Sequence, residues 1–194
     1  PFKAWSTASP LSTPRSSISG AGTVDAAIFT GGEPNQFTTV EEYNGSGWST
    51  EASLNTGRYY IVGTGTVTAA LSSAGFAPSV PGDTGATEEY NGTSWSEQND
   101  IPSGQSQAMG AGTQTASLFF GGTPPGKVAT FEYDGTNWTA GGSMSTPRGN
   151  GFGGGVQTAA LAAAGYQPSF TNIANAEEYD GTSWTNTNNV NTAR

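Results

Sequence analysis

The sequence predicts an all-β protein built from four tandem repeats. Tryptophans recur 43 to 47 residues apart, and a fixed pattern of apolar and basic residues follows each of them. The 29 glycines among 194 residues point the same way, because short strands joined by tight turns need residues that tolerate positive φ. We therefore expect one domain over residues 1–194, with repeats at approximately 14–56, 57–103, 104–146 and 147–194.

The tryptophans open the most regular block of each repeat. They are Trp5, Trp48, Trp95, Trp138 and Trp184. An apolar residue follows six positions later, and four positions beyond it stands arginine or, once, glutamine. These last residues are Arg15, Arg58, Gln105, Arg148 and Arg194. We predict that Trp48, Trp95 and Trp138 are mostly buried at equivalent places in successive repeats, because large aromatic side chains fill the space between packed sheets.

A tyrosine block precedes four of the tryptophans. Its tyrosines are Tyr43, Tyr90, Tyr133 and Tyr179, and each is followed by Asn-Gly or Asp-Gly. These dipeptides are typical of type I′ hairpin turns, in which both central residues take positive φ. The block therefore predicts a strand ending near each tyrosine, a tight turn, and a strand starting near each tryptophan.

The third block is rich in glycine and alanine and begins at Gly20, Gly63, Gly110 and Gly153. Such density fits strands crowded near a central axis, where side chains have little room. Each repeat then comprises four strands, with small residues in the inner pair and aromatic residues in the outer pair. This arrangement is the blade of a small β-propeller.

Residues 1–13 hold a fifth tryptophan strand without the other blocks, so we expect a surplus outer strand at the N-terminus. Two strands compete for the outer edge of the fourth blade. Closing a hairpin costs less chain entropy than joining distant ends, so the Trp184 strand is expected to take that edge. In the alternative, the Trp5 strand closes the ring.

A hydrophobic strand, a double glycine such as Gly31-Gly32, and then a tyrosine and a tryptophan separated by a short gap resemble the kelch repeat. The resemblance covers nearly the whole chain and implies a kelch-like propeller of four four-stranded blades. Two sequence motifs of the repeats also resemble the Gly/Thr/Asn-rich kelch-like proteins of marine bacteriophages and bacteria. They are Glu-Glu-Tyr-Asp-Gly-Thr-Ser-Trp and Gly-Thr-Gln-Thr-Ala. That likeness implies a virion tail, fibre or surface component.

Composition argues against several classes of function. The formal net charge of −9 would repel phosphate backbones and anionic membrane surfaces, so nucleic acid is not expected as a partner. No run approaches the ~20 apolar residues of a membrane span, so membrane insertion is not expected either. The chain has no His and no Cys, which removes most zinc sites and both the Ser-His and Cys-His nucleophile pairs. We expect no catalytic residues, no cofactor and no metal site.

Paired acids recur at Glu41-Glu42, Glu88-Glu89 and Glu177-Glu178 and invite comparison with glycosidase carboxylates or calcium ligands. Neighbouring residues on a strand point to opposite faces. We therefore expect one member of each pair to face solvent and the other to meet a repeated arginine. Near-identical copies do not offer the asymmetry that two-carboxylate catalysis requires.

Binding differences are expected in the loops that depart from the repeat, over residues 76–84, 123–127 and 166–175. The candidate binding residues are Phe76, Pro78, Asp83, Lys127, Tyr166 and Phe170. The leading hypothesis is a non-enzymatic structural or receptor-binding module of an extracellular assembly or virion. It would form homo-oligomers or assemble with other subunits, and its receptor could be a cell-surface glycan. A propeller lectin is the alternative, and a glycan-active enzyme is the third reading.

Overall fold

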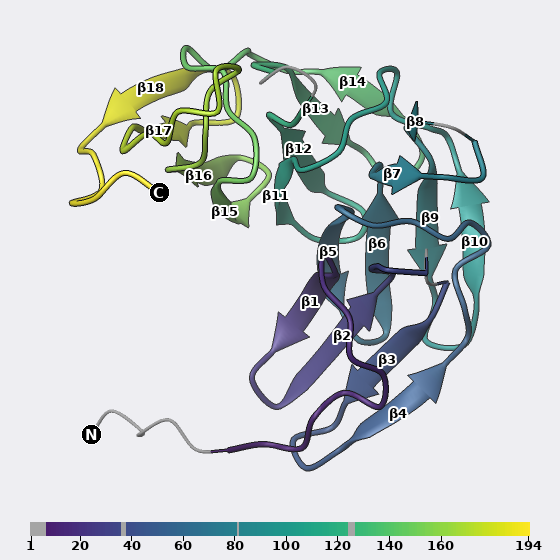
Figure 1. Ribbon diagram of the computed structural model, residues 1–194. Coiled ribbons are helices and arrows are strands. Elements are labelled where there is room, and N and C mark those ends of the chain that lie inside the picture. Colours follow the sequence, from purple (N-terminus) through teal and green to yellow (C-terminus); the bar gives the residue numbers. More distant parts are fainter. Residues whose placement is uncertain (1–6, 36–37, 81, 124–126) are drawn as a thin grey trace.

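The computed structural model describes residues 7–35, 38–80, 82–123 and 127–194. All secondary structure in these residues is β-strand and turn, arranged as four four-stranded antiparallel sheets and one two-stranded hairpin (Figure 1). No helix in the described ranges is long and apolar enough to cross a membrane. The predicted all-β fold of four four-stranded blades is thus confirmed.

Each sheet is one blade. Blade 1 contains β1 (Ser19–Thr23), β2 (Ala26–Thr30), β3 (Val40–Tyr43) and β4 (Trp48–Glu51). Blade 2 contains β5 (Val62–Thr66), β6 (Ala69–Ser73), β9 (Thr87–Tyr90) and β10 (Trp95–Gln98). Blade 3 contains β11 (Met109–Gly112), β12 (Ser117–Phe120), β13 (Thr130–Tyr133) and β14 (Trp138–Ala140). Blade 4 contains β15 (Phe152–Val156), β16 (Ala159–Ala163), β17 (Ala176–Tyr179) and β18 (Trp184–Thr187). The hairpin of β7 (Phe76–Ala77) and β8 (Gly82–Asp83) projects from blade 2.

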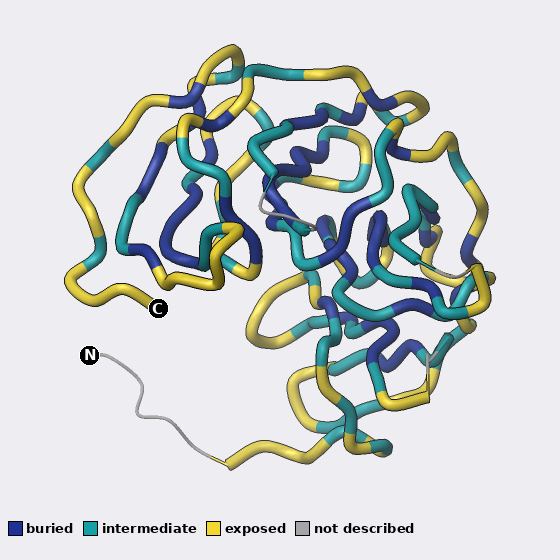
Figure 2. The backbone as a smooth tube through the Cα atoms, turned by 45° about the horizontal axis from the view of Figure 1, so that its top comes forward, coloured by how far each residue is buried: buried dark blue, intermediate teal, exposed yellow. Residues whose placement is uncertain are grey.

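The inner strands line a central axis and the tryptophan strands form the periphery (Figure 1). Strand β1 packs on β5, β5 on β11, and β11 on β15. No comparable contact joins β15 to β1 in the described residues, so the four blades form an open arc. Buried residues concentrate between successive blades, while turns and the C-terminal tail are exposed (Figure 2).

The inner strands need glycine for a steric reason. Gly65 has a φ of 100°, and a Cβ there would collide with the carbonyl oxygen of Ala69 in the next strand. Gly112 occupies the equivalent place in blade 3, with a φ of 104°. The predicted small-residue inner strands therefore arise from close backbone approach.

The hairpins between tyrosine and tryptophan strands differ from the predicted type I′ turn. Tyr90 pairs directly with Trp95, which leaves a four-residue loop. Within it only Gly92 takes positive φ, while Asn91 Oδ1 accepts hydrogen bonds from the amides of Thr93 and Ser94 at 2.9 Å each. The type I′ prediction is wrong because the side chain of Asn91 satisfies the loop amides itself. Asp134 and Asp180 accept equivalent bonds in blades 3 and 4.

The tryptophans pack each blade on the blade before it. Trp95 and Trp138 are both 7% exposed, which confirms the prediction for these two residues. The indole of Trp138 donates to Thr87 Oγ1 of blade 2 at 3.0 Å, and that of Trp184 donates to Thr130 Oγ1 of blade 3 at 2.9 Å. Trp48 is only half-buried, because no blade precedes it in the structure.

The edge of blade 4 follows the prediction. Strand β18 pairs with β17, with Trp184 opposite Tyr179. The competing Trp5 lies outside the described residues, and residues 7–13 form no strand. They run beside blade 1 instead, where the Trp48 indole donates to the carbonyl oxygen of Ser9 at 2.8 Å.

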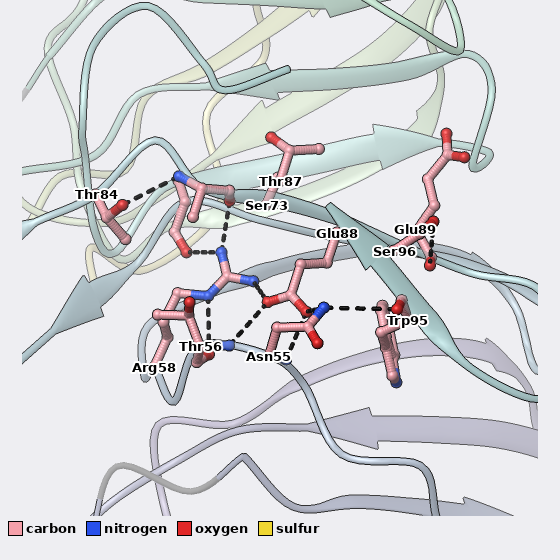
Figure 3. A network of polar contacts seen from close by, with 12 residues as sticks. Asn55, Thr56, Arg58, Ser73, Thr84, Thr87, Glu88, Glu89, Trp95 and Ser96 are labelled. Carbon is pink, nitrogen blue, oxygen red and sulfur yellow. Dashed lines mark hydrogen bonds and ion pairs between the residues drawn. The ribbon is translucent and has the colours of Figure 1, made fainter. Parts of the chain in front are cut away.

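A buried ion pair anchors the segment that enters blade 2 (Figure 3). Arg58 Nη2 lies 2.7 Å from Glu88 Oε1, and both side chains are fully buried. Arg58 also donates to the carbonyl oxygens of Ala74 and Ala86, and Glu88 accepts from the amide of Asn55 at 2.7 Å. Arg15–Glu41 and Arg148–Glu177 repeat this pair in blades 1 and 4, at 3.1 and 2.7 Å. The predicted pairing of one repeated glutamate with a repeated arginine is confirmed.

Where another blade follows, the glutamate before the repeated tyrosine faces that blade rather than open solvent, which corrects the prediction for Glu89, whereas Glu178 faces solvent as predicted. Glu89 accepts a hydrogen bond from the Tyr133 hydroxyl at 3.0 Å, and Glu132 accepts one from Tyr179 at 2.6 Å. Burial and the bonded Glu132 raise the pKa of Tyr179 to about 12. Only Glu178 of blade 4 is exposed, because no blade follows it in the structure.

Candidate binding site

Four residues at one repeated position, each just before the first strand of its blade, lie around one end of the central axis, which we call the loop end. Ser17, Tyr60, Gln107 and Asn150 each stand two residues after the repeated Arg or Gln, and each has a φ of 55°. Their backbones form a hydrogen-bonded series across the blades. The amide of Tyr60 donates to the carbonyl of Ser17 at 2.9 Å, that of Gln107 to Tyr60 at 3.3 Å, and that of Asn150 to Gln107 at 2.7 Å.

This backbone conformation is unusual for residues other than glycine. Left-handed φ costs a non-glycine residue roughly 1 kcal/mol or more, and it clusters at binding sites. The interblade hydrogen bonds hold the conformation, while the side chain differs in every repeat: hydroxyl, phenol, and two amides of different length. The fold fixes the position of each side chain without fixing its chemistry.

The side chains enclose a polar hollow of about 450 Å³ to which all four blades contribute. Its lining residues are Ser17, Ile18, Tyr60, Ile61, Gln107, Ala108 and Asn150. A smaller hollow of about 260 Å³ lies along the inner strands, and it shares Ile61 and Ala108 with the first. The axis is thus open at the loop end, with amides and hydroxyls at its mouth.

A third, more apolar hollow of about 370 Å³ adjoins the polar hollow and shares Tyr60 and Gln107 with it. Tyr59 and Phe76 form its aromatic wall, with ring centroids 5.2 Å apart, and Tyr60 lies 5.1 Å from Tyr59. Asp83 on β8 contributes a carboxylate to the lining. The β7–β8 hairpin therefore adds an aromatic and an acidic side chain to the axial face.

The loop after β16 approaches the same place from blade 4. The Tyr166 hydroxyl donates to Gln107 Oε1, which also accepts from Thr123 Oγ1 at 3.2 Å. The ring of Phe170 packs at a tilt against that of Tyr166, with centroids 5.5 Å apart, and Phe170 is 82% exposed. Burial raises the pKa of Tyr166 further above neutral pH, in keeping with a protonated hydroxyl that donates this hydrogen bond.

The structure distributes the predicted binding residues unevenly. Phe76 and Asp83 line the apolar hollow, and Tyr166 bonds to Gln107, which belongs to both hollows. Lys127 lines neither hollow and donates from Nζ to Ser103 at 3.2 Å. Pro78 is half-buried in the β7–β8 connection and also lines neither.

Sequence reasoning missed the residues that surround the axis. They are Ser17, Tyr59, Tyr60, Gln107 and Asn150. A usable signal was present: the position two residues after the repeated Arg or Gln changes chemistry in every copy, although the pattern on both sides repeats.

The buried acids do not form a second site. The carboxylates of Glu88 and Glu177 form ion pairs with their arginines and accept hydrogen bonds from backbone amides. Among the described residues no group of three or more acidic side chains is placed to hold a metal ion.

These features define the protein as a four-bladed β-propeller with a polar, aromatic-rimmed hollow at the loop end of its axis. A scan of protein-family models finds no match to the chain, and a search of curated proteins finds none either.

Proposed function

We propose that the protein is a non-enzymatic receptor-binding module of an extracellular assembly, and that it recognises a neutral, hydroxylated ligand such as a cell-surface glycan at the axial hollow. One observation carries this proposal. Four different polar side chains occupy one strained backbone position, around a hollow that all four blades line. Strained backbone of this kind clusters at ligand-binding sites, and here the fold repeats it once in each blade around a single hollow.

The chemistry of the lining favours hydroxylated ligands. Gln107 and Asn150 offer amide donors and acceptors, and Ser17 offers a hydroxyl. Tyr60 and Phe76 supply flat apolar faces beside them. Ligand sites combine aromatic surface with a few convergent polar groups in this way. A net charge of −9, with Asp83 in the lining, disfavours anionic ligands.

The proposal that this module belongs to a virion rests on the sequence pattern. The double glycines of the first and third repeats and the tyrosine and tryptophan blocks resemble those of kelch repeats, and the four blades are compatible with that resemblance. The Gly/Thr/Asn-rich sequence of the repeats favours a virion tail, fibre or surface component. A virion would present the axial face outward as its receptor-binding surface.

A glycan array followed by calorimetry tests the proposal. We expect the native chain to bind neutral glycans, and Tyr60→Ala and Gln107→Ala each to weaken binding at least about tenfold, since each loss of 1.4 kcal/mol is a factor of ten. Val24→Ala is the matched control, because Val24 is 84% exposed beyond the opposite end of β1. Absence of glycan binding, or binding that both axial substitutions leave unchanged, would contradict the proposal.

A further inference from the structure

The three interfaces between successive blades share one construction. The earlier blade supplies an aliphatic residue on its second strand and, opposite it on the third strand, a glutamate. Leu71 and Glu89 of blade 2 are such a pair, and they meet Tyr133 and Trp138 of blade 3. Leu118 and Glu132 of blade 3 meet Tyr179 and Trp184 of blade 4 in the same way.

Blade 4 carries the same face, and none of the residues that the structure describes packs on it as a following blade would. Leu161 pairs with Glu178 in the register of Leu71 with Glu89. Glu178 is exposed, and Leu161 is only half-buried, whereas its counterpart Leu118 is fully buried. Phe152 on β15 is 63% exposed, although Met109 at the equivalent place in blade 3 is 3% exposed. These three residues of blade 4 line an open groove of about 510 Å³.

Blade 1 carries the complementary face. Trp48 lies with its ring centroid 5.0 Å from Phe29 and 5.0 Å from Tyr43, and all three residues are half-buried. Tyr43 and Trp48 correspond to the Tyr133 and Trp138 pair that blade 3 inserts against blade 2. The chain therefore ends its arc with a receiving face on blade 4 and an inserting face on blade 1.

We propose that a second copy of this chain docks its blade 1 on blade 4 of the first, with the aromatic face of Phe29, Tyr43 and Trp48 against Phe152, Leu161 and Glu178. The Tyr43 hydroxyl then donates to Glu178, as Tyr133 donates to Glu89 inside the chain. Two such contacts close a head-to-tail ring of two copies. Its eight blades fall within the range of about four to eight that propellers use. Both copies would line the axis.

The C-terminal tail competes for part of this contact. Residues 9–15 of the incoming copy and residues 188–194 of the receiving copy hold equivalent places in the repeat. The first segment is anchored by the Arg15–Glu41 ion pair and by the Ser12 amide, which donates to Glu41 at 2.8 Å. The tail is exposed, and two backbone hydrogen bonds hold it: the Val190 amide donates to Ala174, and the Gly165 amide donates to Arg194. We therefore expect the incoming segment to displace the tail.

Light scattering of the full chain across roughly 1–100 μM measures the mass directly. We expect twice 19.7 kDa. Added salt should favour the two-copy particle, because it screens the repulsion between copies of charge −9. A mass of 19.7 kDa at every concentration and salt would overturn the proposal, whether blade 1 and blade 4 of one chain close on each other or the faces stay apart.

Variants on the two faces locate the contact. Leu161→Arg and Glu178→Arg on blade 4, and Tyr43→Glu on blade 1, should each halve the mass, while the exposed control Val80→Arg should not change it. Glu178 is exposed, so its variant keeps the test valid if Leu161→Arg unfolds.

Mixing Leu161→Arg with Tyr43→Glu restores one intact contact, and only a head-to-tail arrangement predicts that the two monomers then associate. Deleting residues 188–194 should raise the two-copy fraction. Failure of the mixture to associate, or loss of association on deletion, would contradict the docking register.

Discussion

Blades 2 and 3 solve the same packing problem with different chemistry. Under blade 2, Arg58 and Glu88 form a fully buried ion pair. Under blade 3, Gln105 and Phe131 occupy the equivalent positions, and both are buried. Both positions differ between the two blades. The fold therefore requires two buried side chains that fill the space and suit each other at these positions, and it does not require that they be charged.

The two solutions have different weaknesses. The ion pair of blade 2 is well supplied with hydrogen bonds, but losing either partner would strand a buried charge. Blade 3 avoids that hazard and leaves the Gln105 amide without a hydrogen-bond partner among the described residues. An unpaired buried amide costs less than an unpaired buried charge.

The largest expected effect comes from breaking the ion pair of blade 2. Glu88→Ala leaves the Arg58 guanidinium buried without its counter-charge and should lower the free energy of unfolding by about 3–5 kcal/mol. Chemical denaturation monitored by tryptophan fluorescence measures this change.

The double variant Arg58→Gln with Glu88→Phe transplants the solution of blade 3 into blade 2. Because the two sites are in contact, their effects should not add, and we expect the double variant to recover about 2 kcal/mol relative to Glu88→Ala. A double variant no more stable than Glu88→Ala would show that the two blades differ in more than this pair.

The next largest effect distinguishes an internal blade from the first one. Trp95 is buried between blades 1 and 2, so Trp95→Ala should cost about 3 kcal/mol. Trp48 is half-buried against residues 7–13, and Trp48→Ala should cost clearly less in dilute, monomeric protein. Equal shifts in melting temperature, followed by circular dichroism, would contradict this difference between the first blade and the internal blades.

Much of the fold followed from spacing alone. The tryptophan and tyrosine blocks located strands β3–β4 and β17–β18 because repetition averages out local ambiguity. The turn type did not follow, since Asn-Gly fits several hairpin loops and the Tyr90–Trp95 pairing selects a four-residue one. The open arc was not predictable either, because ring closure depends on the angle between blades and no local pattern encodes it.

The site was predicted in part for a similar reason. Phe76 and Asp83 stood out because their loop breaks the repeat, and they do lie at the axial face. Tyr60 and Gln107 lie within the regular part of the repeat, where variation in side chain carries the signal and length does not. Their left-handed backbone comes from interblade hydrogen bonds that exist only after the blades assemble.

A smaller effect concerns pH and blade 4. Burial opposes ionisation of Glu177, but hydrogen bonds from Ser145 and Arg148 outweigh it and lower the pKa of the carboxyl below its usual 4.5. The unfolded chain then binds the proton more tightly, so this contribution to stability is complete above pH 4.5 and is lost as pH falls through the lower folded pKa. Glu177→Gln should flatten the acid limb of the melting temperature profile. An unchanged acid limb would assign the pH dependence to other carboxylates.

The smallest effect separates the first interface from the other two. Trp138 and Trp184 donate their indole N–H to Thr87 and Thr130, but the residue at that place in blade 1 is Val40. The Trp95 N–H is accordingly buried without a hydrogen-bond partner among the described residues.

Val40→Thr keeps the branched shape and supplies an acceptor in the position that Thr87 and Thr130 occupy. The hydroxyl costs desolvation, whereas satisfying the buried indole removes a penalty of about 1–3 kcal/mol, so we expect a net gain of about 1 kcal/mol. The reverse change, Thr87→Val, should orphan the Trp138 N–H and destabilise blade 3 by a comparable amount. Denaturation midpoints that move in opposite directions would show that the blades differ here by one acceptor. If Val40→Thr destabilises while Thr87→Val is neutral, apolar packing dominates this interface and the hydroxyls are incidental to it.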